Sequence, residues 1–563
     1  MFWKAGLVLA VVLIGIPAGY LTFEHYRGKR RLAATIARLQ SQGERLDIDL
    51  ISPPPAAPAT DLAPLIQVAA QLEDGGRLSP PAMRCIQPAR AIPSPRLTNW
   101  ASIPNREIGW TQVEEWAEAS EPDLKELHKA LAQPGLRASL DYSKGFQMLL
   151  THLAPLKSVA NALSTSAAFA ARQDNPDRAI ADLKAIGRAT AVLGDEPIAI
   201  SQLVRIAMVA IALNRSWDIL HGGAWNDAQL QRLDAALPDD DLVGAMVTAL
   251  EGERAIALTT MRQMSPKEMA ELLDGFPGLG GAPGPAAMPT TLDDLLEFTG
   301  ELVANLAGFI RNRVILPFWR FAFNDHAIAA YLDVMQEVID ASRKTHQERR
   351  LPTPANAVDP GALAASRPAS GPIDAITRVY VKSSVPALSG MLTKAFAADI
   401  QRTLLRTDIA LHRYKLRHGR YPESLDALVP EFLPAVPIDA ADGQPIRYRF
   451  TPDQPDEPEP LLWSAGENGV DDGGDPEIKG GNLASTFHWW RGKDAVWPRP
   501  ASPAETAAWL EKEEQSRKRH RRPEGSPQFQ MSPELMKRYG LIPATADSPT
   551  NPPAPAPTPS PAP

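Results

Sequence analysis

The chain has 563 residues, enough for two or three domains, and 44% of them are hydrophobic. Its formal net charge of −8 argues against a nucleic-acid-binding protein, because such a protein needs a basic surface for the phosphate groups. Cys85 is the only cysteine, which excludes an internal disulfide and a zinc cluster held by cysteines.

The amino-terminal residues are typical of a membrane anchor. Ala5–Phe23 is a 19-residue apolar run without a charge, close to the ~20 residues that a transmembrane helix needs. The run is longer than the apolar core of a signal peptide, and no clean small-residue cleavage site follows it. We therefore expect residues 1–30 to form an uncleaved transmembrane helix that holds the protein in a membrane, and Arg31–Leu46 to continue as a juxtamembrane helix.

Residues 113–350 are predicted to form an irregular α-helical domain, which proline-rich linkers within 31–112 and at 351–375 separate from its neighbours. Its segment Pro197–Leu220 is apolar nearly all round, so it should lie at the centre of the bundle. Successive helices resemble tetratricopeptide hairpins locally, but the roughly 34-residue period of such repeats does not recur. The residues of this segment expected to be buried are Leu203, Ile206, Val209 and Leu213.

Residues 376–500 combine a helix with short strands. The helix Asp399–His418 should end at Gly419, which supplies a left-handed cap, and Pro422 prevents the helix from continuing. Alternating and apolar runs predict the strands, and glycines and aspartates predict the loop between them. The predicted strands are Ile446–Phe450, Leu461–Ser464 and Thr486–Trp490, and the acidic glycine loop is Gly466–Asp475.

An ordered series of motifs runs through this part of the chain: His418–Pro422, Leu428–Pro434, Asp442–Tyr448 and Ser464–Gly474. The series resembles the C-terminal module of the major pseudopilin of type II secretion, and the resemblance covers about a seventh of the chain. It implies a long helix packed on a small antiparallel sheet, with a calcium-binding loop after the second strand.

The resemblance also implies a set of calcium ligands. Carried over by position, they are Asp471, Asp472 and Asp475, with Glu467 as a weaker candidate. Ca²⁺ takes roughly six to eight oxygen ligands, and closely spaced carboxylates repel one another without it. The alternative is a solvated acidic loop, because the spacing is not that of an EF-hand.

The chain departs from that family at its amino terminus. A pseudopilin carries a processing site just before its hydrophobic helix, whereas Met1–Lys4 leads straight into apolar residues, so we expect neither cleavage by a prepilin peptidase nor assembly into a pilus. The whole chain also resembles a group of uncharacterised membrane-anchored bacterial proteins that carry this module. The cations within Arg27–Arg31 favour a cytoplasmic body. The resemblance favours an extracytoplasmic body at the bacterial inner membrane, and this is the location that we expect.

The sequence contains no zinc-protease, serine-hydrolase, Walker or Rossmann motif. Glu251, Glu253 and Arg254 lie in an otherwise apolar helical stretch and could supply a buried acid–base pair, although a helix with one wet side is the simpler interpretation. His412 and His418 are six residues apart, so they do not share a helix face for a metal.

Residues 501–563 are predicted to form a charged helix and then a disordered proline-rich tail. The basic run Arg517–Arg522 is interpreted as a solvated helix end rather than a phosphate-binding site. Trp489, Trp490 and Trp497 follow the small sheet, and we expect them to cover its exposed face or to stack on a ligand.

The expected fold class is mainly α: a transmembrane helix, an irregular α-helical domain, a small α+β pseudopilin-like module and a disordered tail. We expect a non-catalytic, membrane-anchored envelope interaction or scaffold protein, with a protein partner, no nucleic acid and calcium as its cofactor. The alternative is a membrane-anchored hydrolase whose site is assembled from distant residues. A deep cleft in which Glu, His and Arg side chains converge would favour that alternative.

Overall fold

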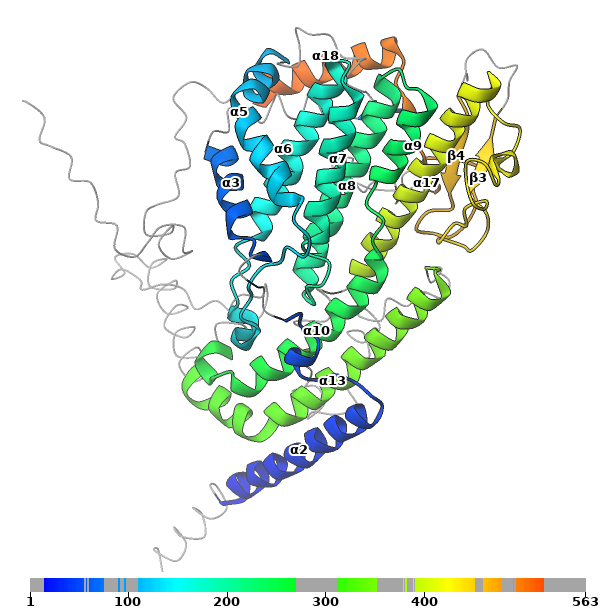
Figure 1. Cartoon of the computed structure of the whole chain (residues 1–563). Coiled ribbons are helices and arrows are strands. Elements are labelled where there is room, and N and C mark those ends of the chain that lie inside the picture. Colours follow the sequence, from blue (N-terminus) through cyan, green and yellow to red (C-terminus); the bar gives the residue numbers. More distant parts are fainter. Residues whose placement is uncertain are drawn as a thin grey trace, which may run out of the picture. The chain divides into compact units, whose positions relative to one another are not determined.

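The computed structural model shows a mainly helical protein with little sheet (Figure 1). By contact density the chain divides into Met1–Thr506 and Ala507–Pro563. The structure describes residues 15–54, 57, 60–74, 90–91, 96–97, 110–269, 311–351, 378, 380–381, 388, 390–450, 459–477, 490 and 493–520. The predicted linker at 351–375 beyond Leu351 and the predicted disordered tail lie outside these residues.

A layer of helices forms the first part of the body (Figure 1). Polar caps fix several helix starts, as the sequence indicates: the Asn226 side chain accepts the backbone N–H of Gln229, and the Gln229 side chain accepts the N–H of Asn226 in return. The helices of this layer are α3 (Ala63–Asp74), α5 (Trp110–Leu131), α6 (Leu153–Arg172), α7 (Pro176–Ala191), α8 (Ala199–Gly222) and α9 (Asp227–Ala236).

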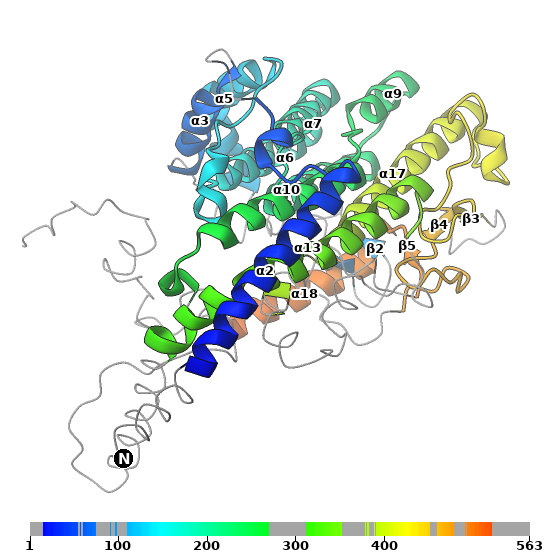
Figure 2. The ribbon, with the colours of Figure 1, turned by 90° about the horizontal axis from the view of Figure 1, so that it is seen from below.

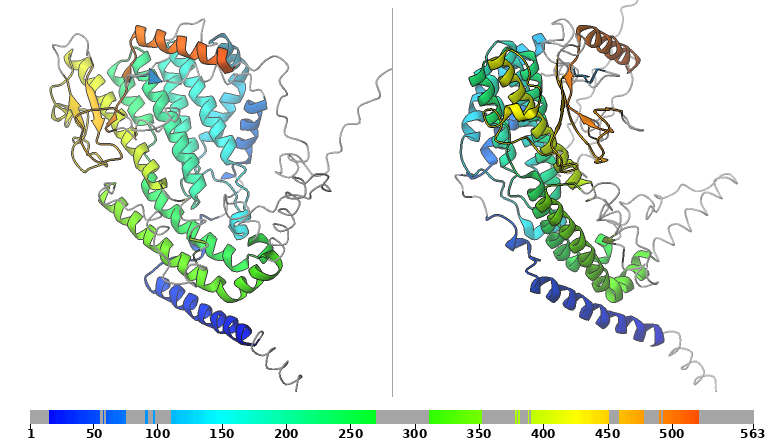
Figure 3. Two further views of the ribbon diagram at one scale, coloured as in Figure 1. Left: turned by 180° about the vertical axis from the view of Figure 1, so that it is seen from behind. Right: turned by 90° about the vertical axis from the view of Figure 1, so that its right-hand side faces the viewer.

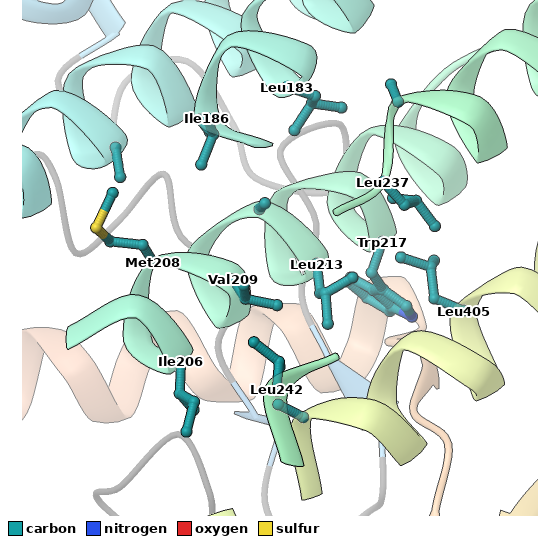
Figure 4. Close-up of a cluster of buried hydrophobic side chains, with 14 of the residues drawn as sticks. Leu183, Ile186, Ile206, Met208, Val209, Leu213, Trp217, Leu237, Leu242 and Leu405 are labelled. Carbon is teal, nitrogen blue, oxygen red and sulfur yellow. The ribbon is translucent and has the colours of Figure 1, made fainter. Parts of the chain in front are cut away.

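Helix α8 lies at the centre, packed against α6, α7 and α17 (Met391–His418). Ile206, Val209 and Leu213 are buried as expected, whereas Leu203 is only partly buried. Figure 4 shows these three buried side chains near residues of α7 and α17 such as Leu405. Most polar residues of α8 are buried too, and the strongest example is Arg215, whose guanidinium contacts Ser164 and Asp218.

A second layer consists of α10 (Leu242–Gln263), α13 (Leu316–Glu348) and α2 (Ile16–Ser41), with a π-helical turn η5 (Arg311–Ile315) leading into α13. Figures 2 and 3 show α2, in dark blue, running alongside α13, in green. The two helices are parallel, because His25 contacts Phe321 near their starts and Glu44, just beyond α2, contacts Arg343 near the end of α13.

The expectation of a transmembrane anchor is corrected here. No helix of the described residues is long and apolar enough to cross a membrane. Residues 5–14 of the expected anchor lie outside the described part, and Ile16–Phe23 forms the first two turns of α2, a 26-residue helix rich in arginine that packs along α13. The predicted fold class and the predicted single-pass location at the bacterial inner membrane are therefore wrong in this respect.

The C-terminal part of the body is built on α17, which begins eight residues before the predicted start at Asp399. It ends as expected at Gly419, whose φ of 73° is left-handed and therefore suits glycine. A short 3₁₀ turn, η6 (Leu425–Leu428), leads to a three-stranded antiparallel sheet in the order β3-β4-β5. Its strands are β3 (Arg447–Arg449), β4 (Leu461–Ser464) and β5 (Ala495–Val496).

The third strand differs from the prediction, since β5 takes the place expected for Thr486–Trp490, of which only Trp490 is described. A second small sheet joins β1 (Arg90–Ala91), β2 (Arg96–Leu97) and β6 (Arg499–Pro500), the last pair parallel. Helix α18 (Pro503–His520) is the last described element, and it spans the division of the chain into two units.

Candidate functional site

The acidic loop after β4 holds the four predicted calcium ligands, and its best-connected member is Asp471. Trp463 Nε1 donates to Asp471 Oδ1 at 2.9 Å, and Arg447 Nε lies 3.4 Å from Oδ2. Burial would raise the pKa of Asp471, but the hydrogen bonds from Trp463 and the Gly473 N–H, with the charge of Arg447, outweigh it and lower that pKa.

The other three predicted ligands have separate neighbours. The Asp475 carboxylate lies 2.8 Å from Lys493 Nζ and also accepts the backbone N–H of Glu477. The hydrogen bond from Lys493 and that from Glu477 lower the pKa of Asp475. Asp472 accepts a hydrogen bond from the Asn468 amide at 3.3 Å, and Glu467 is exposed.

The loop is closed by a residue that the sequence analysis did not single out. Asp494, which immediately precedes β5, is buried, and its carboxylate accepts the backbone N–H groups of Asp472, Gly474 and Asp475 at 3.1, 2.8 and 3.0 Å. Burial raises the pKa of Asp494 and these hydrogen bonds oppose the rise. A lone aspartate between Lys493 and a strand gives no local signal of this role, because its partners are about twenty residues away.

The predicted ligands therefore do not fit a preformed calcium site. Within the described residues, no group of three or more His, Cys, Asp or Glu side chains is placed to hold a metal ion. For a cation to bind, Asp471 has to leave Arg447 and Asp475 has to leave Lys493. Calcium binding remains a prediction from the sequence.

Thermal melts of the full-length protein with and without millimolar calcium test that prediction. If the ion binds, the folded state gains RT ln(1 + [L]/Kd), about 2.7 kcal/mol at a hundred times Kd, and the wild-type melting temperature rises. Asp472→Ala should remove most of that rise and leave the calcium-free melt unchanged. Magnesium serves as the control ion. If calcium changes the melting temperature of neither the wild type nor Asp472→Ala, the loop is closed by Asp494 alone.

Of the residues considered for an acid–base pair, Glu251 and Arg254 belong to a buried ionic network. Arg254 is fully buried, and its Nη2 lies 2.9 Å from Glu44 Oε2, while Arg343 bridges Glu44 and Glu251. Burial would raise the pKa of Glu44, but hydrogen bonds from Arg343, Arg254 and Gln336 lower it to about 2. The interpretation of this stretch as a wet side of the helix is wrong, because these side chains join α10 to α13 and to the end of α2.

Glu253 faces elsewhere, and its carboxylate accepts the N–H of Ala199 at 2.9 Å. Burial raises its pKa. Glu251 and Glu253 therefore act on different partners, and the geometry gives no acid–base pair between them.

A second buried cluster joins the helical layer to the C-terminal part. Asp408 of α17 lies 2.9 Å from His221 Nε2 of α8 and 3.2 Å from His412 Nδ1, and it accepts a hydrogen bond at 2.9 Å from Trp497 Nε1, just after β5. Burial would raise the pKa of Asp408, but the two histidines outweigh it and lower that pKa strongly. Glu459 and other residues line a cavity of about 20 Å³ beside the cluster, which has room for about one water molecule.

The remaining predicted residues are not brought together. His418 is exposed, and its ring lies 4.2 Å from the Tyr414 ring at an angle of 34°. Trp490 and Trp497 are buried in the core, while Trp489 lies outside the described residues. The side chains of the basic run Arg517–Arg522 also lie outside them.

No family model, curated protein or solved structure matches this chain. The resemblance of residues 399–475 to pseudopilins thus rests on the sequence motifs alone and remains a prediction. What the chain does has to be inferred from its own surface.

Among the described residues, exposed apolar side chains gather around the starts of α2 and α13, and we name this patch the α2–α13 surface. It comprises eight residues that are each 43–64% exposed: Ile16, Tyr20, Phe23 and Tyr26 of α2, Val314 and Ile315 of η5, and Phe318 and Phe321 at the start of α13. Large apolar patches on a protein surface commonly mark a site of interaction. The sequence analysis missed it, because it assigned the α2 residues to a membrane anchor and gave no sign that α13 lies beside them.

Side-chain contacts hold the first turns of α2 and α13 beside each other. The His25 ring stacks on Phe321 with 4.4 Å between centroids, and its Nδ1 lies 2.6 Å from the Phe321 carbonyl oxygen. Behind the patch, Glu24 and His326 are both buried, 3.2 Å apart, and Gly28 approaches His326 so closely that a Cβ would lie 2.9 Å from the ring. The exposed residues therefore belong to one supported surface rather than to two independent helix ends.

Proposed function

We propose that the protein is a non-catalytic interaction protein that docks through the α2–α13 surface and holds its C-terminal α+β module at a fixed distance from it. The observation that carries this proposal is the exposure of the eight apolar residues of that surface. Burying such residues against a partner is favourable by roughly 25 cal/mol per Å² of apolar area.

Helix α13 links the α2–α13 surface to the C-terminal α+β module. It begins in the α2–α13 surface and has 33 residues, so it is about 50 Å long. Just after its end, the Leu351 N–H donates to the Ala440 carbonyl oxygen at 2.7 Å, and Arg350 lies within 4 Å of the position that a Cβ of Gly443 would take. One helix therefore spans from the docking surface to the module, which suits a spacer or scaffold.

Two cavities among the described residues give the hydrolase alternative no support. The cavity beside His221 and Asp408 brings His, Glu and Arg side chains together but has room for about one water molecule. A cavity of about 520 Å³ lies between η4 (Tyr142–Gln147) and the end of α10, and no histidine or arginine is among its lining residues.

A photo-reactive amino acid placed in the full-length protein in living cells tests the proposal. We expect adducts at Tyr20 and at Phe318 several-fold more often than at Lys129 on α5, whose side chain is 75% exposed and serves as the matched control. Equal yields at the three positions, or adducts only to the protein's own chain, would contradict a docking role for this surface.

A further inference from the structure

We propose that the α2–α13 surface docks on an anionic lipid bilayer, lying in the interface without crossing it. The inference rests on the docking function proposed above and names its partner. Three observations carry it: the order of apolar and basic residues along α2, the second apolar stripe supplied by α13, and the local charge.

The exposed face of α2 changes from apolar to basic along the helix. Ile16, Tyr20, Phe23, Arg27 and Arg30 follow one another at intervals of four, three, four and three residues, so they form a single stripe. The apolar part of the stripe is about 10 Å long, and the first cation lies about 6 Å further on. With this end of α2 tilted about 5–10 Å into the boundary between headgroups and acyl chains, the apolar part of the stripe is covered and the arginines further along the helix lie at the level of the phosphates.

The start of α13 widens the apolar end of that stripe. Val314 of η5 and Phe318 and Phe321 of α13 follow one another at intervals of four and three residues, and the Phe321 ring stacks on His25 of α2. Tyr20 and Tyr26 of α2 suit the bilayer interface, because a tyrosine ring is apolar and its hydroxyl is polar, while phenylalanine is common on the buried face of interfacial helices. Two adjacent stripes give a broader contact than a single amphipathic helix.

The charge around the surface is opposite to that of the whole chain. Residues 15–33 and 311–325 contain seven basic residues and two acidic ones, whereas the complete protein has a net charge of −8. Of the two acids, Glu24 is buried beside His326 and contacts Arg27, and Asp325 is partly buried. Arg27, Lys29, Arg30, Arg31 and Arg313 are exposed.

The positive charge around the α2–α13 surface favours a lipid surface as its partner over a second copy of the protein. In a two-fold dimer the same patch contacts itself, so the cations of two copies would face each other and repel. Anionic headgroups instead attract each nearby Lys or Arg by about 1 kcal/mol. The sequence before α2 is compatible with the same partner, since residues 5–14 contain no charged residue.

Sedimentation of the full-length protein with vesicles tests the inference. The vesicles contain phosphatidylcholine alone or with about a quarter phosphatidylglycerol. We expect the wild type to bind the anionic vesicles. The double variant Phe23→Ser/Phe318→Ser should bind them with an affinity about tenfold or more lower, because the apolar contact is lost. Lys29→Glu/Arg30→Glu should weaken binding to a similar extent. Raising the salt concentration from about 0.05 to about 0.5 M should also weaken it, because the shorter Debye length screens the attraction to the headgroups.

Matched controls separate this surface from a general effect. Leu149→Ser removes another strongly exposed apolar side chain, and Lys125→Glu/Lys129→Glu reverses two exposed charges on α5, so both variants should bind as the wild type does. Absence of binding to either vesicle, or binding that neither surface variant weakens, overturns the inference.

The outcome also separates this inference from the docking function. If light scattering shows a lipid-free dimer that Phe23→Ser/Phe318→Ser dissociates, and vesicles do not bind, the surface docks a second copy and only the lipid assignment fails. If in-cell adducts at Tyr20 and Phe318 do not exceed those at Lys129, the docking function itself fails.

Discussion

Replacing Arg254 with alanine is expected to lower the free energy of unfolding by about 3–5 kcal/mol, because it removes one partner from a buried ionic network. The guanidinium is fully buried and contacts Glu44, the Arg45 carbonyl oxygen and Gln336. Its loss leaves the buried Glu44 carboxylate with fewer hydrogen bonds. Urea unfolding of the full-length protein, followed by circular dichroism, measures the change.

The same network predicts a loss of stability in acid. The pKa of Glu44 is about 2 in the folded protein against 4.5 for an ordinary glutamate, so its contribution is complete above pH 4.5 and is lost as the pH falls toward 2. The difference corresponds to about 3 kcal/mol, because each pKa unit is worth about 1.4 kcal/mol. Glu44→Gln should unfold with a correspondingly smaller dependence on pH in this range.

A surface pair provides the control for Arg254→Ala. Arg38 and Asp333 lie 2.6 Å apart with side chains 47% and 38% exposed, so Arg38→Ala should cost about 1 kcal/mol or less. Equal losses for the two variants would mean that the Arg254 network adds no more than an exposed ion pair does.

Replacing Asp408 with asparagine is expected to lower the free energy of unfolding by about 3 kcal/mol near pH 6. The carboxylate contacts His221, His412 and Trp497, and so joins α8, α17 and the segment after β5. The amide of asparagine has nearly the same shape but no charge, and it can accept through only one oxygen. Thermal melts at a series of pH values, followed by tryptophan fluorescence, measure the loss.

The sign of the pH dependence identifies the groups involved. Burial would lower the pKa of His412, but Asp408 outweighs it and raises that pKa above 6.5. The contribution of His412 is therefore complete below pH 6.5 and is lost as the pH rises through the folded pKa. The pKa of Asp408 is lowered below 3.8, so its contribution is present above pH 3.8 and is lost in acid.

The cluster should therefore be strongest between about pH 4 and 6.5, and Asp408→Asn should abolish the decline on the alkaline side. His346→Gln is the control, because the pair of His346 and Asp241 is exposed and should contribute about 1 kcal/mol or less. If the melting temperatures of the wild type and Asp408→Asn differ by the same amount at every pH from 6 to 9, Asp408 and His412 are not coupled in this way.

The sequence predicts best those elements whose partners are close in the chain. Gly419 ends α17 because a left-handed residue is needed there, and β4 has the predicted bounds Leu461–Ser464. The burial of Val209 and Leu213 follows from a segment that is apolar nearly all round. Each of these inferences uses only local periodicity or backbone preference.

The features that the sequence does not predict depend on partners far apart in the chain. Arg254 contacts Glu44, 210 residues earlier, so a charged residue inside an apolar helix was interpreted as solvated although it is fully buried. Asp408 and His412 share a helix face at a spacing of four, which was a usable signal, but His221 is 187 residues away. The apolar run before Phe23 indicated a membrane span, and nothing local showed that α13 would lie beside it.

The parallel pairing of α2 with α13 has a consequence for synthesis of the chain. His25 and Phe321 are 296 residues apart, so at about 5–20 residues per second α2 leaves the ribosome roughly 15–60 s before the start of α13. During that interval the face of α2 that holds Leu32 and Leu39 has no α13 to pack against. Helix α2 is therefore among the last described helices to reach its final place, and a chain terminated before residue 316 leaves this face uncovered.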